Sequence, residues 1–164
     1  MASAQRETEL AQLVEHLHAE VAKRDRLLAA SEEMSTPVIQ VWKGILAMPL
    51  VGAIDAARAT RIMENLLNGI VRTEAELVIL DITGVPVVDT AVAHHLLNTI
   101  KAASLLGAQC VLVGISRETA ISIVHLGVDL GGIVIRSNLQ AGIEYALGEL
   151  GLTVVSRHAA ETSD

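Results

Sequence analysis

The 164-residue sequence contains no Phe, one Trp, one Tyr and one Cys, so aromatic packing and internal disulfides are excluded as the basis of its core. Apolar residues still make up 51% of the chain, which leaves Ile, Leu, Val and Ala to fill the interior. A chain of this length can form one domain with an appendage, but not two ordinary domains. The single Cys110 lies in an apolar run and is expected to be a small buried thiol.

Long hydrophobic runs and an excess of positive charge are also missing. The longest apolar stretches, at 77–80 and 110–115, are far shorter than the roughly 20 residues of a membrane helix. Twelve Lys and Arg against 19 Asp and Glu give a net charge of −7, which repels phosphate backbones. Residues 1–9 lack the cationic and apolar segments of a signal peptide. We therefore expect a cytoplasmic protein whose partners include neither a membrane nor a nucleic acid.

Residues 7–30 are charged, free of Gly and Pro, and marked by a stripe of apolar residues. The stripe alternates in steps of four and three and is broken at Arg24, a spacing typical of a two-stranded coiled coil. A homodimer is therefore expected, and the alternative is a helix that folds back on its own domain. The predicted dimer seam consists of Leu10, Val14, Leu17, Val21 and Leu28. Pro37 ends the segment, because the residue before a proline is disfavoured in a helix.

Beyond Pro37, short β-type runs alternate with one-faced helical segments. Residues 38–41 and 45–50 predict a hairpin, in which Pro49 suggests that the second strand lies at an edge or ends there. Further strands are predicted at 77–82, 109–115 and 133–135, and helices at 55–70, 90–106, 116–126 and 138–150. This order predicts an α/β fold with a mostly parallel sheet of four to five strands, an antiparallel edge and about four helices.

The loop over 81–90 is the predicted functional site, because functional groups in parallel sheets gather at the carboxyl ends of the strands. Gly84 permits an unusual backbone conformation, Pro86 stiffens the loop, and Asp89 or Thr90 occupies the N-cap position of the next helix. A phosphate on the Thr90 hydroxyl would add nearly two negative charges. These charges would lie beside the free N–H groups of the helix start, which attract them, and beside the Asp89 carboxylate, which repels them. On the residues alone, the alternative is a plain helix cap.

The segment Asp-Ile-Thr-Gly-Val-Pro-Val-Val-Asp-Thr over 81–90, followed by Val-Ala-His-His over 92–95, resembles the STAS domain of RsbR-type stressosome scaffold proteins. Leu-Gly-Ala at 106–108 and Leu-Val-Gly-Ile at 112–115 extend the resemblance, which covers about 35–150. These proteins regulate the general stress response and are related to anti-sigma-factor antagonists. Together with the resemblance, the sequence predicts a helical, coiled-coil linker over 1–34 and a STAS domain over 35–155. The tail over 156–164 is polar and is expected to be disordered.

In that family, the residue after the second aspartate of the loop is phosphorylated by a serine/threonine kinase, which implies Thr90 here. A second phosphorylated hydroxyl on the next helix corresponds to Ser122, where relatives commonly carry Thr. A Ser122 hydroxyl turned toward the helix backbone is the alternative, and Thr119 is a nearby competitor. The surface implied for the loop and its partner comprises Asp81, Thr83, Gly84, Pro86, Asp89, His94 and His95.

The resemblance implies a non-enzymatic scaffold that sequesters an RsbT-type serine/threonine switch kinase and releases it on phosphorylation. The implied partners are a second copy, a paralogous STAS protein in a large hetero-oligomer, and a phosphatase that reverses the phosphorylation. One alternative is a simple anti-sigma-factor antagonist that binds an anti-sigma kinase directly, against which Ser122 and the helix over 7–30 argue. Another is a receiver-like domain phosphorylated on Asp81, although the further acidic pair and lysine of receivers are not apparent.

Metal and enzyme chemistry find little support in the sequence. His94 and His95 are neighbours on a predicted helix, where adjacent side chains point about 100° apart and cannot comfortably chelate one ion. Neither a phosphate-binding Gly-rich loop nor a Gly-x-Ser-x-Gly nucleophile turn is present. We therefore expect no metal, no cofactor and no enzymatic activity.

Overall fold

The chain divides into two units, and the boundary in the sequence falls between Ser35 and Thr36. The computed structural model describes residues 2–157, apart from the side chains of 2, 3, 21, 22 and 24–35. The first unit is one helix, α1 (Ala2–Ser35), which extends beyond the predicted 7–30 at both ends and stops before Pro37, as expected.

The apolar stripe of α1 is open to solvent where it is described. Leu10, Val14 and Leu17 are 61%, 49% and 53% exposed, and the predicted seam members Val21 and Leu28 have side chains outside the described residues. Leu13, which was not assigned to the seam, is 53% exposed and widens the stripe. The helix therefore presents an uncovered apolar surface of the kind that a second helix could bury.

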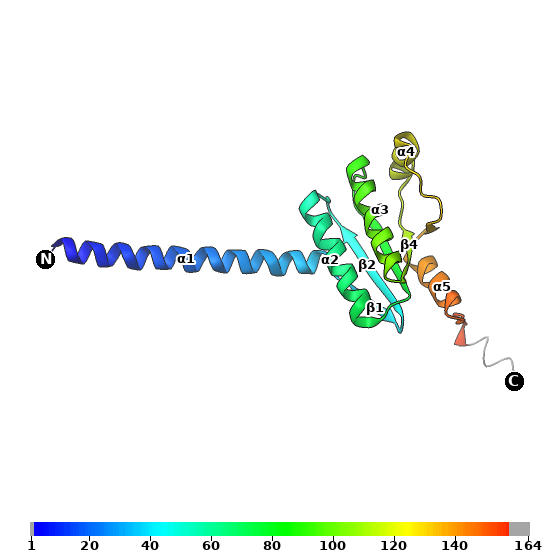
Figure 1. The fold of residues 1–164 in the computed structure, drawn as a ribbon, viewed down its shortest axis with the longest axis horizontal. Helices are drawn as coiled ribbons and strands as arrows, with labels where there is room; N and C mark the ends of the chain where they lie inside the picture. Colours follow the sequence, from blue (N-terminus) through cyan, green and yellow to red (C-terminus); the bar gives the residue numbers. More distant parts are fainter. Residues whose placement is uncertain (1, 158–164) are drawn as a thin grey trace. The chain divides into compact units, whose positions relative to one another are not determined.

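The second unit is an α/β domain built on one five-stranded sheet (Figure 1). The strands run in the order β1-β2-β3-β4-β5, and β1 is antiparallel to β2 while all other neighbours are parallel. This architecture confirms the predicted mostly parallel sheet with an antiparallel edge. Its elements are β1 (Ile39–Trp42), β2 (Ile45–Val51), α2 (Ala56–Thr73), β3 (Leu77–Gly84), α3 (Thr90–Leu105), β4 (Gln109–Val113), α4 (Arg117–Leu126), β5 (Val134–Arg136) and α5 (Leu139–Glu149).

Short polar side chains set where the helices of this domain begin. In each of α2 to α5, the residue before the helix accepts a hydrogen bond from the backbone N–H three positions later, which satisfies one of the free donors of the first turn. The four caps are Asp55, Asp89, Ser116 and Asn138. The sequence prediction left Asp89 and Thr90 as alternatives, and the structure assigns the cap to Asp89.

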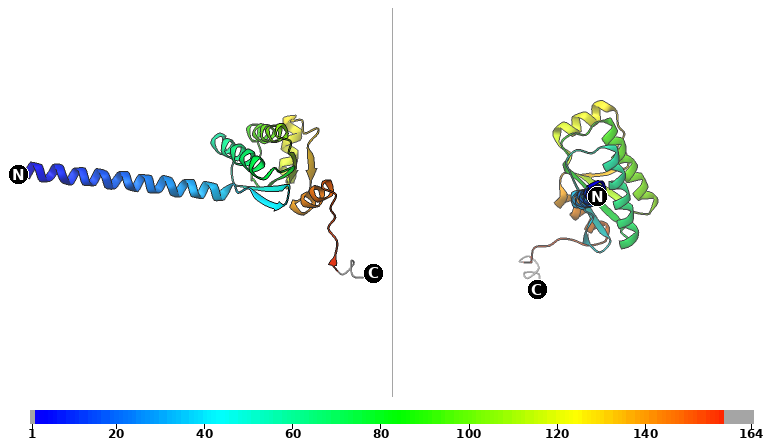
Figure 2. Two further views of the ribbon diagram at one scale, coloured as in Figure 1. Left: turned by 60° about the horizontal axis from the view of Figure 1, so that its bottom comes forward. Right: turned by 90° about the vertical axis from the view of Figure 1, so that its left-hand side faces the viewer.

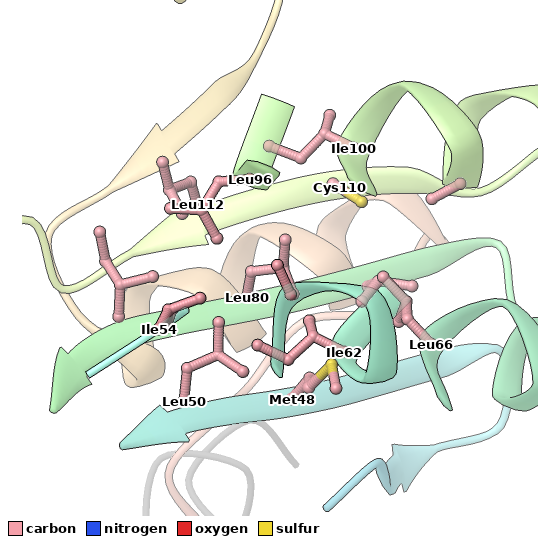
Figure 3. Packing of buried hydrophobic residues seen from close by; sticks show 14 of the residues in the cluster. Met48, Leu50, Ile54, Ile62, Leu66, Leu80, Leu96, Ile100, Cys110 and Leu112 are labelled. Carbon is pink, nitrogen blue, oxygen red and sulfur yellow. The ribbon is translucent and has the colours of Figure 1, made fainter. Parts of the chain in front are cut away.

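The sheet is covered on both faces, which explains why its central strands are continuous apolar runs. Helices α2, α3 and α4 lie over one face and α5 over the other (Figure 2). Under α2 and α3, Met48, Leu80 and Leu112 pack against Ile62 and other apolar helix residues (Figure 3). The residues that alternate with them, such as Ile79 and Val111, form a smaller cluster beneath α5.

The expectation for Pro49 was wrong, because β2 is an inner strand that continues to Val51. The reason lies in the shortness of β1, whose pairing with β2 reaches no further than Ala47. Past that residue, β2 has a paired neighbour only in β3, so a proline without an N–H donor can be accommodated there.

Candidate functional site

The carboxyl ends of the parallel strands meet at one edge of the sheet, as predicted for the loop that follows β3. Backbone hydrogen bonds hold this edge together from strand to strand. The Gly52 N–H donates to the Gly84 carbonyl at 2.9 Å, and the Gly114 N–H donates to the Ser137 carbonyl at 3.3 Å. The loop to Thr90 therefore leaves the sheet from an edge at which backbone hydrogen bonds join neighbouring strand ends.

Asp81 and Thr83 form the base of this loop. The backbone N–H and the hydroxyl of Thr83 both donate to Oδ1 of Asp81, at 2.9 and 2.5 Å. Asp81 is half-buried and Thr83 is exposed. This carboxylate oxygen holds the loop in place, which is a structural task unlike the phosphoacceptor role that the receiver-like alternative gives to Asp81.

The middle of the loop is anchored in the core by two valines. Val85 and Val88 are each 5% exposed and belong to the main core, and the Val85 N–H donates to the Ile82 carbonyl at 3.0 Å. Pro86 is exposed between them, and Val87 is 66% exposed. The loop thus buries two of its valines and displays the Pro86-Val87 pair to solvent.

Asp89 and Thr90 have different tasks at the start of α3. Oδ1 of Asp89 accepts a hydrogen bond from the Val92 N–H at 2.9 Å, while the exposed Thr90 is the first helical residue. The N–H groups of Thr90 and Ala91 belong to the first turn, which has no intrahelical acceptors. An anion on the Thr90 hydroxyl would lie near these donors and the positive end of the helix dipole, but also beside the Asp89 carboxylate.

The second predicted hydroxyl, Ser122, is half-buried on α4, and no described residue accepts a hydrogen bond from it. Its competitor Thr119 is 4% exposed, and Oγ1 of Thr119 accepts a hydrogen bond from the Ser116 hydroxyl at 2.9 Å. Ser122 is therefore the more accessible of the two. Ile123, beside it, lines one crevice with Ala93 of α3, so the helix that carries Ser122 packs beside the helix that begins at Thr90.

The remaining candidate residues, His94 and His95, belong to no group of possible metal ligands in the described part of the chain. His94 is exposed and His95 half-buried on the first turns of α3. In the described part of the chain, no three His, Cys, Asp or Glu side chains are grouped so that they could hold a metal ion. None of the described helices has the length and apolarity needed to cross a membrane. Cys110 is buried as predicted, and burial raises the pKa of its thiol to about 12.

Gly114 is a residue of this edge to which the sequence analysis gave no role. It follows β4 with a φ of +81°, and a Cβ atom there would lie 2.1 Å from Oγ1 of Thr83 and 2.8 Å from Oδ1 of Asp81. The only sequence signal was a glycine near the end of the strand predicted over 109–115, in the Leu-Val-Gly-Ile segment, and the structure ends that strand at Val113. That signal indicates a turn, but it does not reveal which residue the glycine approaches.

The family model of the STAS domain matches residues 36–141, so the chain belongs to the STAS domain family. The RsbT co-antagonist protein RsbRA of Bacillus subtilis (strain 168) is 51% identical over 127 residues, which are 77% of this chain and 46% of that protein. RsbRB of the same organism is 40% identical over 131 residues, 78% of this chain and 47% of that protein. The chain is thus closely related to the RsbR co-antagonists and spans about half the length of these curated relatives.

Solved structures agree with this assignment. A single-site variant of the RsbS protein of Moorella thermoacetica superimposes with a TM-score of 0.62 at 27% identity, covering 71% of this chain and 98% of that one. A chain of the stressosome, described as a signal integration and transduction hub, gives a TM-score of 0.57 at 29% identity, covering 70% and 98%. The predicted STAS fold and the predicted relation to RsbR proteins are both confirmed.

Proposed function

We propose that this chain is a non-enzymatic, phosphorylation-switched scaffold of a stressosome-like complex, which holds an RsbT-type serine/threonine kinase and releases it on phosphorylation. The observation that carries the proposal is the exposed Thr90, which follows the capping Asp89 at the start of α3. Because the cap is supplied by Asp89, the Thr90 hydroxyl is not needed to begin the helix. The names of the RsbT co-antagonist relatives support the choice of kinase.

The proposed reaction is a phosphoryl transfer in which the chain is the substrate. Oγ1 of Thr90 forms a bond to the γ-phosphorus of ATP, the bond from that phosphorus to ADP breaks, and the hydroxyl proton passes to a base of the kinase. The product carries nearly two more negative charges at pH 7. These charges would repel Asp89, which caps α3 through Val92, so phosphorylation alters both the charge and the helix start.

Ser122 is the proposed second acceptor, because it is more accessible than Thr119 on the same helix. The apolar stripe of α1 is the proposed homodimer contact, since Leu10, Val14 and Leu17 are about half exposed or more. We further propose a cytoplasmic assembly with a paralogous STAS protein, and a phosphatase that reverses the switch. Two acceptors and a dimerising helix fit a scaffold better than a simple anti-sigma-factor antagonist.

Intact-mass measurement and peptide mapping after incubation with an RsbT-type kinase and ATP test the proposal. The variants are Thr90→Ala and Ser122→Ala, with Thr60→Ala as a matched control. Thr60→Ala removes an exposed helical hydroxyl, which donates a hydrogen bond to the Ala56 carbonyl. We expect phosphate on Thr90 that disappears only in Thr90→Ala, and kinase that elutes with the unmodified chain but separately from the phosphorylated chain. Phosphate on neither Thr90 nor Ser122 would refute the switch.

A further inference from the structure

We propose that Thr83 and Gly114 are positioning residues, which set the place of Thr90 for the kinase by locking the base of its loop against the end of β4. This inference rests on the proposed function, because it concerns how the same acceptor is presented. In the described part of the chain, neither residue is hydrogen-bonded to Thr90. Their effect on Thr90 would therefore be transmitted through the loop over 83–89.

The close approach of Gly114 to Thr83 is the first element of the lock. A Cβ at position 114 would lie 2.1 Å from Oγ1 of Thr83 and 2.7 Å from its backbone nitrogen, and real Cβ atoms do not come so close to other atoms. The backbone after β4 can therefore reach the Thr83 turn only because residue 114 is a glycine. The positive φ of +81° adds a second reason for glycine there.

The Thr83 hydroxyl is the second element. It donates to Oδ1 of Asp81, which also receives the Thr83 N–H, so one carboxylate oxygen fixes both the backbone and the side chain of Thr83. On the other flank, a Cβ at Gly84 would lie 3.0 Å from the Leu50 carbonyl oxygen. The base of the loop is thus confined between the ends of β2 and β4, and Thr90 follows only a few residues later.

A confined loop matters to a kinase because ordering a mobile segment on binding costs free energy, whereas a preformed segment avoids that cost. Loosening the lock should weaken recognition of the loop, which raises KM. The transfer itself is carried out by kinase groups once Thr90 is bound, so kcat should change little. A general loss of folded protein would instead lower the concentration of folded substrate. KM calculated on that folded concentration would then be unchanged.

Two pairs of variants isolate the lock. Gly114→Ala is compared with Gly107→Ala, because Gly107 has a similar φ of +87° but nothing within 4 Å of a built Cβ. Both substitutions carry the same kind of backbone strain, and only the first pushes against Thr83. Thr83→Val, which removes the donor while keeping the shape, is compared with Thr83→Ser, which keeps the donor. The full chain is used throughout, and urea unfolding of each variant reports the folded fraction.

The measurement is steady-state phosphorylation of Thr90 by an RsbT-type kinase. We expect Gly114→Ala and Thr83→Val to raise KM by roughly tenfold or more with kcat within about twofold, because the free energy needed to order the loosened loop on binding is taken from its binding to the kinase. Gly107→Ala and Thr83→Ser should retain the wild-type KM. If Gly114→Ala fails to fold, the two Thr83 variants decide the question.

Equal KM values for Thr83→Val and Thr83→Ser, or for Gly114→Ala and Gly107→Ala, would overturn the positioning role while leaving the switch at Thr90 intact. A wild-type chain that takes no phosphate on Thr90 would overturn the proposed function, and this inference with it.

Discussion

Oδ1 of Asp89 lies 2.9 Å from the backbone nitrogen of Val92 and accepts its hydrogen bond, which makes Asp89 the N-cap of α3. The neighbouring Thr90 is exposed and has no part in that bond. The structural role and the proposed phosphoacceptor role are therefore carried by adjacent residues, and they can be separated by mutation.

Asp89→Ala should lower the free energy of unfolding by about 1 kcal/mol, because it removes the N-cap of α3. Asp89→Asn should cost less than this, since the Asn side-chain oxygen can still accept from Val92. Thr90→Ala, at an exposed first helical position, should change stability by less than about 0.5 kcal/mol. Urea unfolding followed by circular dichroism measures all three. A Thr90→Ala variant as unstable as Asp89→Ala would show that Thr90 has a structural role as well.

Much of this domain follows from local sequence patterns. The helices predicted over 55–70, 116–126 and 138–150 begin at Asp55, Ser116 and Asn138, which are the caps in the structure, because a short polar side chain before apolar residues at helical spacing marks a helix start. The central strands were equally evident as apolar runs. Pro49 was misjudged because the outcome depends on how far β1 extends, and pairing length is a tertiary property. Gly114 went unassigned for a related reason, since its contact with Thr83 joins two strands that are distant in the sequence.

Leu80→Ala should be strongly destabilising, because Leu80 is fully buried on β3 beneath α2 and α3. Deleting buried methyl groups loses both transfer free energy and packing contacts, and the cost for such a leucine is about 2 to 5 kcal/mol. Leu105→Ala is the matched control, since Leu105 is 89% exposed and should change stability by less than about 0.5 kcal/mol. Similar urea midpoints for the two variants would contradict the position of the core.

Cys110 should make the stability of the domain depend on pH under alkaline conditions. Burial raises the pKa of its thiol from 9.0 to about 12, so the folded state keeps the proton that the unfolded state loses. This contribution to stability is complete below about pH 9 and is lost as the pH rises toward 12. At pH 10 it amounts to a loss of about 1.4 kcal/mol relative to pH 7.

Comparison of wild type with Cys110→Ala at pH 7 and pH 10 isolates this effect, because other groups titrate equally in both proteins. The difference in unfolding free energy between wild type and Cys110→Ala should shrink at pH 10. Thiol reagents offer an independent check, since the folded wild type should react slowly at pH 8 and quickly once urea unfolds it. Rapid modification of the folded chain would contradict the burial of Cys110.

Substitution of one leucine on α1 should separate the proposed dimer into single chains. Leu10 and Leu17 are 61% and 53% exposed, and burying each in a helix pair would contribute roughly 1.5 to 3 kcal/mol per side chain. Leu10→Lys removes two such contributions per dimer, which corresponds to a loss of affinity of more than about 100-fold. Sedimentation velocity over a range of concentrations measures the change. Gln12→Lys introduces the same side chain off the seam and should leave the dimer intact. Dissociation of both variants would indicate a charge effect. Persistence of both dimers would place the dimer contact elsewhere on the chain.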